Sequence, residues 1–147
     1  MTRFLLSLDQ AVDTVMAAVE NGLPGETWIP RVPSARIRDL ADEMVAAISP
    51  GLPVVETEIR PGEKLHEELV SAEEAPRTVV DGNYYAIKSV LPEVREAGNR
   101  WHKKRPKYEG SCFSSLDDLM HGYQVRELLK EHLLLDPAEF LGEEVLR

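Results

Sequence analysis

The residues best suited to chemistry lie in one short segment, Ile-Arg-Pro-Gly-Glu-Lys-Leu-His-Glu-Glu, at residues 59–68. Arg60 and Glu63 are separated by Pro61-Gly62, a pair that favours a tight turn, so both side chains can face one site. The planar guanidinium of Arg60 suits phosphate oxygens. A carboxylate at Glu63 can accept hydrogen bonds from two ribose hydroxyls. The spacing is therefore compatible with a site for a nucleoside diphosphate.

The same spacing has a simpler interpretation. An Arg-Glu ion pair on a surface loop would look identical in sequence and would contribute little to stability. If residues 54–59 form a strand, Arg60 lies at its carboxyl end, which is where open α/β sheets place ligands. Spacing alone leaves both interpretations open.

The elements that must position this segment follow from periodicity. The first sixty residues predict strand, helix, strand, helix and strand, an α/β arrangement. Ser7 and Gln10 form a capping-box signature at the start of the first helix, and Asn21-Gly22 predicts a left-handed stop. Ser34 is expected to cap the second helix. The expected elements are a strand at 3–6, a helix at 8–21, a strand at 27–29, a helix at 35–48 and a strand at 54–59.

The remaining residues give a weaker pattern. A short helix is expected over 63–70, and strands over 78–80 and 84–87 flank a Gly82-Asn83 turn. Residues 91–110 are polar, basic and rich in helix breakers, which predicts an extended arm. A helical section follows over 116–134, with a further short helix expected over 136–147.

Composition limits the class of protein. The chain has 147 residues, of which 43% are apolar and 29% charged, as is usual for one soluble globular domain. Its net charge of -9 argues against nucleic-acid binding. Cys112 is the only cysteine, which excludes an internal disulfide and fits a reducing compartment. Without a signal-peptide pattern or a long apolar run, the sequence predicts a cytoplasmic protein without a membrane segment.

Several catalytic motifs are missing from the sequence. It has no Gly-x-Gly-x-x-Gly or Gly-x-x-x-x-Gly-Lys loop, no serine nucleophile elbow and no histidine pair with metal-ligand spacing. Tyr84 and Lys88 reproduce the Tyr-x-x-x-Lys spacing of reductases. Their segment has strand character, however, so this spacing is interpreted as coincidence.

The basic cluster at residues 95–107 and Cys112 each have a simpler interpretation than a functional site. Basic residues gather between positions 95 and 107 with aromatic residues among them, which could suggest a nucleic-acid patch. In an acidic chain, a solvated arm or an oligomer contact is the preferred interpretation. Cys112 has no histidine placed beside it and is not expected to be a nucleophile. The basic cluster comprises Arg95, Arg100, His102, Lys103, Lys104, Arg105 and Lys107, with Trp101 and Tyr108 interleaved.

Residues 60–67, Arg-Pro-Gly-Glu-Lys-Leu-His-Glu, resemble the Arg-Pro-Gly-Glu-Lys-x-His-Glu signature of the polysaccharide-biosynthesis (CapD-like) branch of extended short-chain dehydrogenases/reductases. This branch includes the UDP-N-acetylglucosamine 4,6-dehydratases. Residues 2–12 resemble the branch's entry into its substrate domain, and residues 29–41 its next strand and helix. The resemblance covers nearly all of residues 1–90 and becomes weaker beyond them.

The resemblance implies roles for three residues. Arg3 and Arg60 resemble the arginines that hold the UDP pyrophosphate, and Glu63 resembles the acidic residue that binds the uridine ribose. Lys64, His66 and Glu67 also match the signature, but no role follows for them from the sequence.

The resemblance also implies an organisation. The chain corresponds to the C-terminal, substrate-binding part of the enzyme, and the Rossmann half that binds NAD(P) and carries the catalytic Tyr-Lys pair is absent. Residues 1–90 are expected to be a nucleotide-sugar-binding subdomain, 91–112 a basic extended arm and 113–147 a helical extension. The strands near residues 4–6 and 27–29 are expected to need neighbours from the missing half, which would expose apolar edges.

The function that follows is the UDP-sugar-binding portion of a 4,6-dehydratase for surface polysaccharides, with or without inversion at C5 of the sugar. Such a portion is expected to be inactive alone, to form a homo-oligomer and to bind no cofactor itself, NAD(P) belonging to the full-length enzyme. Two alternatives remain, a non-enzymatic nucleotide-sugar-binding module and part of a related epimerase. Whether Met1 is a true start is left open.

Overall fold

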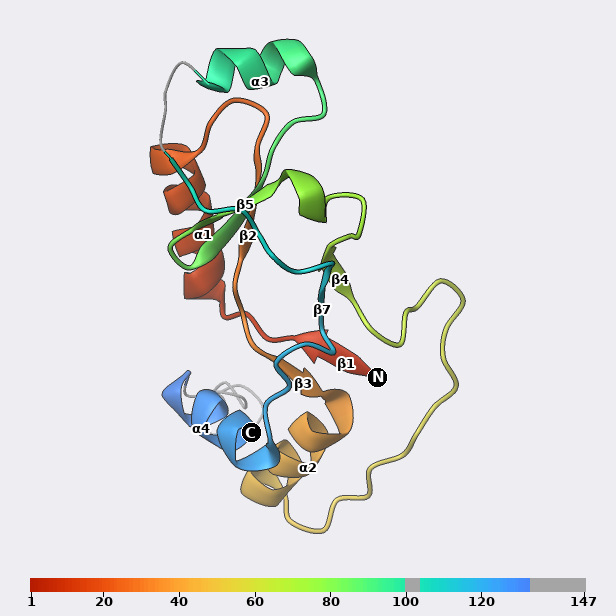
Figure 1. Cartoon of the computed structure of the whole chain (residues 1–147). Helices are drawn as coiled ribbons and strands as arrows, with labels where there is room; N and C mark the ends of the chain where they lie inside the picture. The colour runs from red at the N-terminus through yellow and green to blue at the C-terminus, as the bar shows by residue number, and fades with distance from the viewer. Residues whose placement is uncertain (100–103, 133–147) are drawn as a thin grey trace. The chain divides into compact units, whose positions relative to one another are not determined.

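The computed structural model describes residues 1–99 and 104–132. The chain divides into two compact units, each built from segments far apart in sequence (Figure 1). The first unit consists of Met1–Leu5, Pro33–Glu67 and Ser115–Arg147, and the second of Leu6–Val32 and Glu68–Ser114.

The first unit has a short sheet and two helices. Strand β1 (Thr2–Phe4) pairs antiparallel with β3 (Ser34–Arg36), so that Arg3 lies opposite Ala35. Helix α2 (Ile37–Ile48) follows β3 directly and packs against α4 (Gly122–Glu131). The apolar core of this unit consists of Ala35, Val125 and Leu129, with Leu5, Leu40, Met44 and Met120 packed against it.

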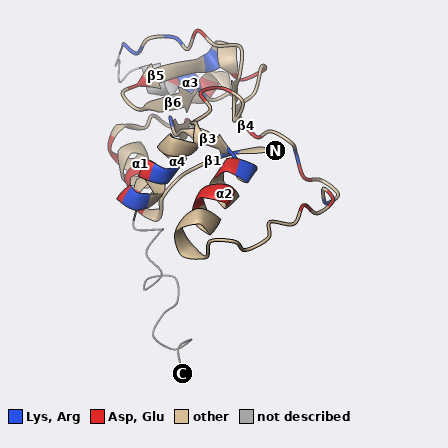
Figure 2. Cartoon of the chain, turned by 90° about the horizontal axis from the view of Figure 1, so that it is seen from below, with Lys and Arg blue, Asp and Glu red and all other residues tan. Residues whose placement is uncertain are grey.

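Helices α2 and α4 of the first unit each contain acidic and basic residues, which are coloured along the ribbons in Figure 2. An ion pair joins them, with Arg126 Nε 2.5 Å from Glu43 Oε2. On α2 itself, Arg38 Nε is 2.9 Å from Asp42 Oδ2, an i,i+4 pair that raises the pKa of Arg38 through its hydrogen bond.

The second unit contains an antiparallel three-stranded sheet in the order β2-β6-β5. The β5–β6 hairpin closes through Gly82-Asn83, and Gly82 has a φ of +59°, which is the left-handed conformation that a two-residue hairpin loop requires. Its elements are α1 (Leu8–Asn21), β2 (Thr27–Pro30), β4 (Glu68–Val70), the 3₁₀ turn η1 (Ala75–Arg77), β5 (Thr78–Asp81), β6 (Tyr84–Ile87), α3 (Pro92–Asn99) and β7 (Phe113–Ser114).

Aromatic packing holds the second unit together. The Tyr85 ring packs edge-on to Phe113 at a centroid distance of 5.1 Å and tilted to Tyr108 at 4.8 Å. The guanidinium of Arg31 lies 5.3 Å from the Tyr85 centroid, within cation–π range. Because β4 pairs with β7, Val70 and Phe113 are both buried beside this cluster.

A buried ion cluster lies in the same unit. The side chains of Arg105 and Glu26 are only 4% and 3% exposed, and they form a direct ion pair. Asp81 Oδ2 lies 3.7 Å from the Arg105 guanidinium. The Glu26 carboxylate also accepts hydrogen bonds from the backbone N–H of Leu23 at 3.0 Å and from Trp28 Nε1 at 3.3 Å. Buried charges are tolerated only when they are satisfied in this way.

Several predictions are confirmed. The fold is a mixed α/β arrangement. The first helix ends at Asn21, and its capping box has Ser7 Oγ accepting from the Gln10 N–H and the Gln10 side chain accepting from the Ser7 N–H. The hairpin around Gly82-Asn83 is present, and Tyr84 lies on a strand as the interpretation of its spacing required.

The predicted strand at 54–59 is wrong. Residues 52–60 have no regular structure, and Val55 and Ile59 are 78% and 51% exposed. Alternation of apolar and polar residues indicates a strand only where a neighbouring strand is available to pair. The helix predicted at 63–70 is also wrong, because residues 68–70 form β4 instead.

Two predictions of helix ends are wrong as well. Gly22 has a φ of -69°, so it is not a left-handed stop. A Cβ there would lie 2.4 Å from the Ala18 carbonyl oxygen, which explains the glycine by close approach instead. Ser34 does not cap α2, because it belongs to β3 and is fully buried, with its hydroxyl donating to the Asp117 carbonyl at 3.0 Å.

The expected arm and extension also need correction. Part of 91–112 is helical, as α3, and Arg105 is buried rather than solvated. The later helix begins at Gly122 rather than at residue 116. Arg100, Trp101, His102, Lys103 and the helix expected over 136–147 lie outside the described residues.

Strands β1 and β2 find partners within the chain, which corrects the expectation that both would need neighbours from elsewhere. Local sequence could not show this, because the partner strands β3 and β6 lie 32 and 57 positions later along the chain, counted from Thr2 to Ser34 and from Thr27 to Tyr84. Among the described residues, no helix is long and apolar enough to span a membrane.

We expect Arg105→Met to lower the free energy of unfolding by about 3–5 kcal/mol, because Glu26 would remain buried without its cation. Urea denaturation would measure the loss. The double variant Glu26→Gln with Arg105→Met should recover part of it, since a neutral amide can still accept the hydrogen bonds. Lys130→Met, which breaks an exposed pair with Glu127, is the control and should change stability by less than about 1 kcal/mol. Equal losses in Arg105→Met and Lys130→Met would contradict the assignment.

Candidate functional site

The Arg60–Glu63 segment forms a tight turn. The Glu63 N–H donates to the Arg60 carbonyl at 3.0 Å, and the Arg60 N–H donates to the Glu63 carboxylate at 3.2 Å. Pro61 occupies the first central position, and Gly62, at the second, has a φ of +85°. This combination defines a type II turn, which requires glycine or asparagine at that position. The turn is therefore fixed locally, although the residues before it lack regular structure.

Arg3, on β1, reaches the same turn. Its Nη2 lies 3.5 Å from Glu63 Oε1, and its Nε lies 3.6 Å from Glu67 Oε1. Its Nη1 also donates to the Thr2 carbonyl at 2.7 Å. The Arg3 side chain is 22% exposed, so part of it remains accessible to solvent. The structure thus brings together Arg3 and Glu63, which are 60 positions apart.

Arg60 differs from Arg3 in its surroundings. It is exposed, and within the described part of the chain its guanidinium makes no hydrogen bond or ion pair. Arg3, by contrast, faces two carboxylates. An incoming anion would meet an uncompensated cation at Arg60 and a compensated one at Arg3.

A buried hydroxyl network lies behind these charges. Thr2 Oγ1 is 2.6 Å from Ser115 Oγ and 2.9 Å from His66 Nδ1. Ser115 Oγ accepts from the Glu67 N–H at 2.8 Å. Thr2 and Ser115 are 3% and 0% exposed, so these bonds are shielded from water. Three segments of the chain meet at this point.

Backbone bonds reinforce the network. The Thr2 N–H donates to the Leu65 carbonyl at 2.9 Å, and the Ser115 N–H donates to the Glu67 carbonyl at 2.8 Å. The Ser115 hydroxyl also lies 3.4 Å from the Thr2 carbonyl oxygen, to which it can donate. The network fixes residues 65–67, and with them Glu67, against β1.

The chemistry available here is recognition of an anion. Two guanidinium groups can give charge-assisted hydrogen bonds to phosphate oxygens, and Glu63 retains lone pairs for hydroxyl donors. Among residues 1–99 and 104–132, no group of three or more histidine, cysteine, aspartate or glutamate side chains is arranged to hold a metal ion.

The sequence singled out Arg3, Arg60 and Glu63 as candidates but not the residues that contact Arg3 and its neighbours. Ser115 belongs to no recognisable motif and lies 48 positions from Glu67. His66 and Glu67 match the signature, yet only the structure shows that His66 contacts Thr2 and that Glu67 pairs with Arg3. Spacing along the chain cannot reveal bonds that depend on tertiary packing.

Comparison with known proteins identifies the family. Residues 1–89 match the family described as polysaccharide biosynthesis protein, and the chain belongs to it. The family predicted from the 60–67 signature is therefore confirmed.

Curated relatives give narrower names. The chain is 42% identical over 87 residues to a UDP-N-acetylglucosamine 4,6-dehydratase (inverting) of Campylobacter jejuni, covering 59% of this chain and 25% of the relative. It is 38% identical over 87 residues to a UDP-glucose 4-epimerase of Rickettsia bellii, covering 59% and 26%. The chain thus spans about a quarter of the length of these relatives.

A solved structure supports the fold. The chain superposes on Pen from Bacillus thuringiensis with a TM-score of 0.76, covering 91% of this chain and 39% of that one. The sequence identity is 23%, so this likeness concerns the fold alone.

We expect Ser115→Ala to destabilise the chain by about 1–3 kcal/mol, because the Glu67 N–H and the Thr2 hydroxyl would lose a buried partner. Urea denaturation measures this loss, and ring ¹⁵N shifts of His66 would report the changed hydrogen bond at Nδ1. Ser49→Ala, at an exposed position of the same unit, is the matched control and should leave both readouts unchanged. A His66 signal that does not respond to Ser115→Ala would show that the network does not connect the two residues.

Proposed function

We propose that residues 1–90 bind the UDP portion of a nucleotide sugar within an enzyme of surface polysaccharide biosynthesis. The observation that carries this proposal is the exposed, uncompensated Arg60, which begins the same type II turn as Glu63, the ion-pair partner of Arg3. Family membership supports it, as do relatives whose names specify UDP-sugars.

In this proposal Arg60 makes the first contact with the pyrophosphate. Arg3 then turns from Glu63 and Glu67 toward the phosphate oxygens, exchanging carboxylate partners for phosphate ones. Release of Glu63 frees its carboxylate for the ribose hydroxyls. The exchange keeps the Arg3 guanidinium paired throughout, and the released Glu67 carboxylate, 40% exposed, can be solvated by water.

The reaction class we favour is 4,6-dehydration of UDP-N-acetylglucosamine or a related sugar, with or without inversion at C5. The higher identity to the dehydratase than to the epimerase, over stretches of equal length, supports this choice. Epimerisation is the alternative within the same family.

The oxidation–reduction chemistry of such a reaction would need NAD(P). The residues of this chain do not fit that role, because the sequence has no glycine-rich dinucleotide loop and Tyr84 lies on a strand. We therefore propose that a separate dinucleotide-binding region supplies the cofactor and the catalytic groups, and that residues 1–147 are inactive alone. The role of this chain is to bind and orient the substrate.

We expect UDP to bind this chain weakly, with a Kd on the order of millimolar, since much of the pocket would come from that other region. Isothermal titration calorimetry should show that Arg60→Ala removes the binding. Arg38→Ala is the control, because it deletes an exposed arginine of the same unit that is paired with Asp42 and Glu56. Equal UDP affinity in the wild type and Arg60→Ala would rule out Arg60 as the phosphate contact.

Helix α1 presents an apolar face that this proposal can explain. Its exposed residues follow helical spacing on one side, with exposures from 52% to 81%. Exposed stripes of this kind mark interaction surfaces. We propose that the dinucleotide-binding region covers this face, and that in its absence the chain forms homo-oligomers through it. The face consists of Leu8, Val12, Val15, Met16 and Val19.

We expect Val15→Lys with Val19→Lys to shift the isolated chain toward monomer, because two charges would disrupt apolar contact along α1. Sedimentation velocity measures the distribution. The control Val55→Lys adds one lysine at an exposed valine outside any helix. It should not change the distribution between monomer and oligomer. If the wild-type chain is already monomeric at high concentration, the proposal that it forms homo-oligomers through α1 is contradicted.

A further inference from the structure

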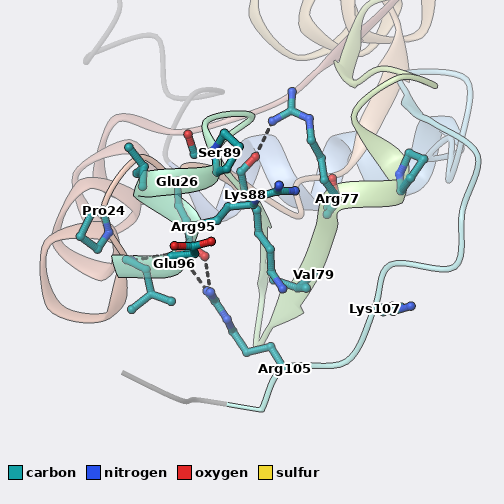
Figure 3. A pocket seen from close by; sticks show the side chains of 15 residues that line it. Pro24, Glu26, Arg77, Val79, Lys88, Ser89, Arg95, Glu96, Arg105 and Lys107 are labelled. Carbon is teal, nitrogen blue, oxygen red and sulfur yellow. Dashed lines mark hydrogen bonds and ion pairs between the residues drawn. The ribbon is translucent and has the colours of Figure 1, made fainter. Parts of the chain in front are cut away.

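The second unit encloses a cavity of about 490 Å³ that shares no residue with the Arg60 site. Its walls come from the loop before β2, from β5, from the end of β6 and from α3, as Figure 3 shows. This volume lies in the range of small-molecule sites. Apolar surface is provided by Val79, Pro92 and Val94.

The wall formed by α3 is closely packed. Gly25 has a φ of +74°, and a Cβ at this position would lie 2.6 Å from Val94 Cγ1 and 3.1 Å from Ser89 Cβ. Glycine is therefore required both for its backbone conformation and for the close approach of α3. The loop that contains Gly25 and helix α3 are therefore in close contact along this wall of the cavity.

Two of the basic residues that line the cavity are already neutralised. Arg105 pairs with Glu26 and Asp81, as described above. Arg77 donates to the Lys88 carbonyl at 2.5 Å and lies 3.3 Å from the Glu74 carboxylate. Hydrogen bonds from the Ser71 N–H and hydroxyl hold the pKa of Glu74 below its usual value, so Glu74 stays anionic and keeps Arg77 engaged.

Three other cations of the lining have no such partner. Within the described residues, Lys88, Arg95 and Lys107 make no side-chain hydrogen bond or ion pair, and Glu96 is the one carboxylate of the lining not engaged by Arg105. Lys88 is half-buried, and Figure 3 labels Lys88 and Arg95 among the lining residues, with Lys107 at the edge. Unpaired cations that line one cavity repel one another, and a bound anion would relieve that repulsion.

We propose that this cavity binds a small phosphorylated organic molecule. Its phosphoryl group would contact Lys88 and Arg95, and its apolar part would lie against Val79, Pro92 and Val94. A free inorganic anion would use only the cations, and a neutral apolar compound only the walls. The combination of both surfaces in one cavity favours a ligand that carries both groups. This inference does not depend on the proposed function of the Arg60 site.

Phenyl phosphate is the probe, titrated into ¹⁵N-labelled chain of 147 residues and followed by amide chemical shifts. Saturating shifts are expected at Lys88, Ser89, Val94 and Arg95, with affinity above that for inorganic phosphate. Lys88→Gln with Arg95→Gln should weaken binding at least tenfold, since each cation contributes charge-assisted hydrogen bonds worth roughly that factor. Lys130→Gln, on α4, should leave the affinity unchanged.

Three results would overturn the proposal. One is the absence of shifts in the second unit at concentrations up to about 10 mM, a limit set by weak small-ligand affinities. Another is binding that is equally strong in the Lys88→Gln/Arg95→Gln variant. The third is a response confined to Arg3, Arg60 and their neighbours, which would place the anion at the other site only. Because Arg60→Ala leaves the cavity intact, failure of UDP binding there and failure of phenyl phosphate binding here can be distinguished.

Discussion

The site depends on one buried hydroxyl, that of Ser115. It accepts from the Glu67 N–H and lies 2.6 Å from the Thr2 hydroxyl, which in turn contacts His66. These bonds join β1, the residues after the type II turn and the segment that follows β7. Without them, Arg3 and its two carboxylates would sit on segments with little else to align them, since residues 52–60 have no regular structure. The exposed charges can therefore be arranged accurately because a shielded, fully satisfied polar network lies beneath them.

The sequence predicted the local parts of this arrangement and failed where tertiary contacts decide. The turn at Pro61-Gly62 and the capping box at Ser7 follow from the conformations and donors of a few adjacent residues, and both are present. The strand expected at 54–59 is absent because alternation of apolar and polar residues forms a strand only where another strand pairs with it, and none of the described strands pairs with this segment. Ser34 has the side chain of a helix cap, yet pairing with Phe4 places it inside a strand. Arg60 and Glu63 were singled out through the contiguous signature at 60–67 and Arg3 through the resemblance of residues 2–12, whereas the contacts of Ser115 are visible only in the structure.

Charge was the least predictable property. The seven basic residues between positions 95 and 107, His102 included, suggested a solvated arm. Nothing in that local pattern distinguishes Arg105 from its neighbours. Its burial depends on Glu26, which lies 79 positions away and presents a carboxylate already bonded to Leu23 and Trp28. A buried arginine requires such a prepared partner, because the desolvation of an isolated charge would cost more than folding could offset. Within the cavity of the second unit, Lys88, Arg95 and Lys107 are recognised as unpaired among the described residues only once the partners of Arg77 and Arg105 are known.

The two proposed anion sites of the chain hold their cations in different ways. At the first, Arg3 is kept in place by Glu63 and Glu67 at 3.5 and 3.6 Å, distances longer than a close charge-assisted hydrogen bond. Contacts of this length orient the guanidinium while leaving its donors available for exchange. At the second, Lys88 is held by its place at the end of β6 and is left without a counter-ion among the described residues. Exchange favours selectivity, since the ligand must outcompete two carboxylates, whereas an uncompensated cation favours affinity for any anion that fits the cavity. A diphosphate, with several oxygens to offer, is the kind of ligand that can displace both carboxylates from Arg3 at once.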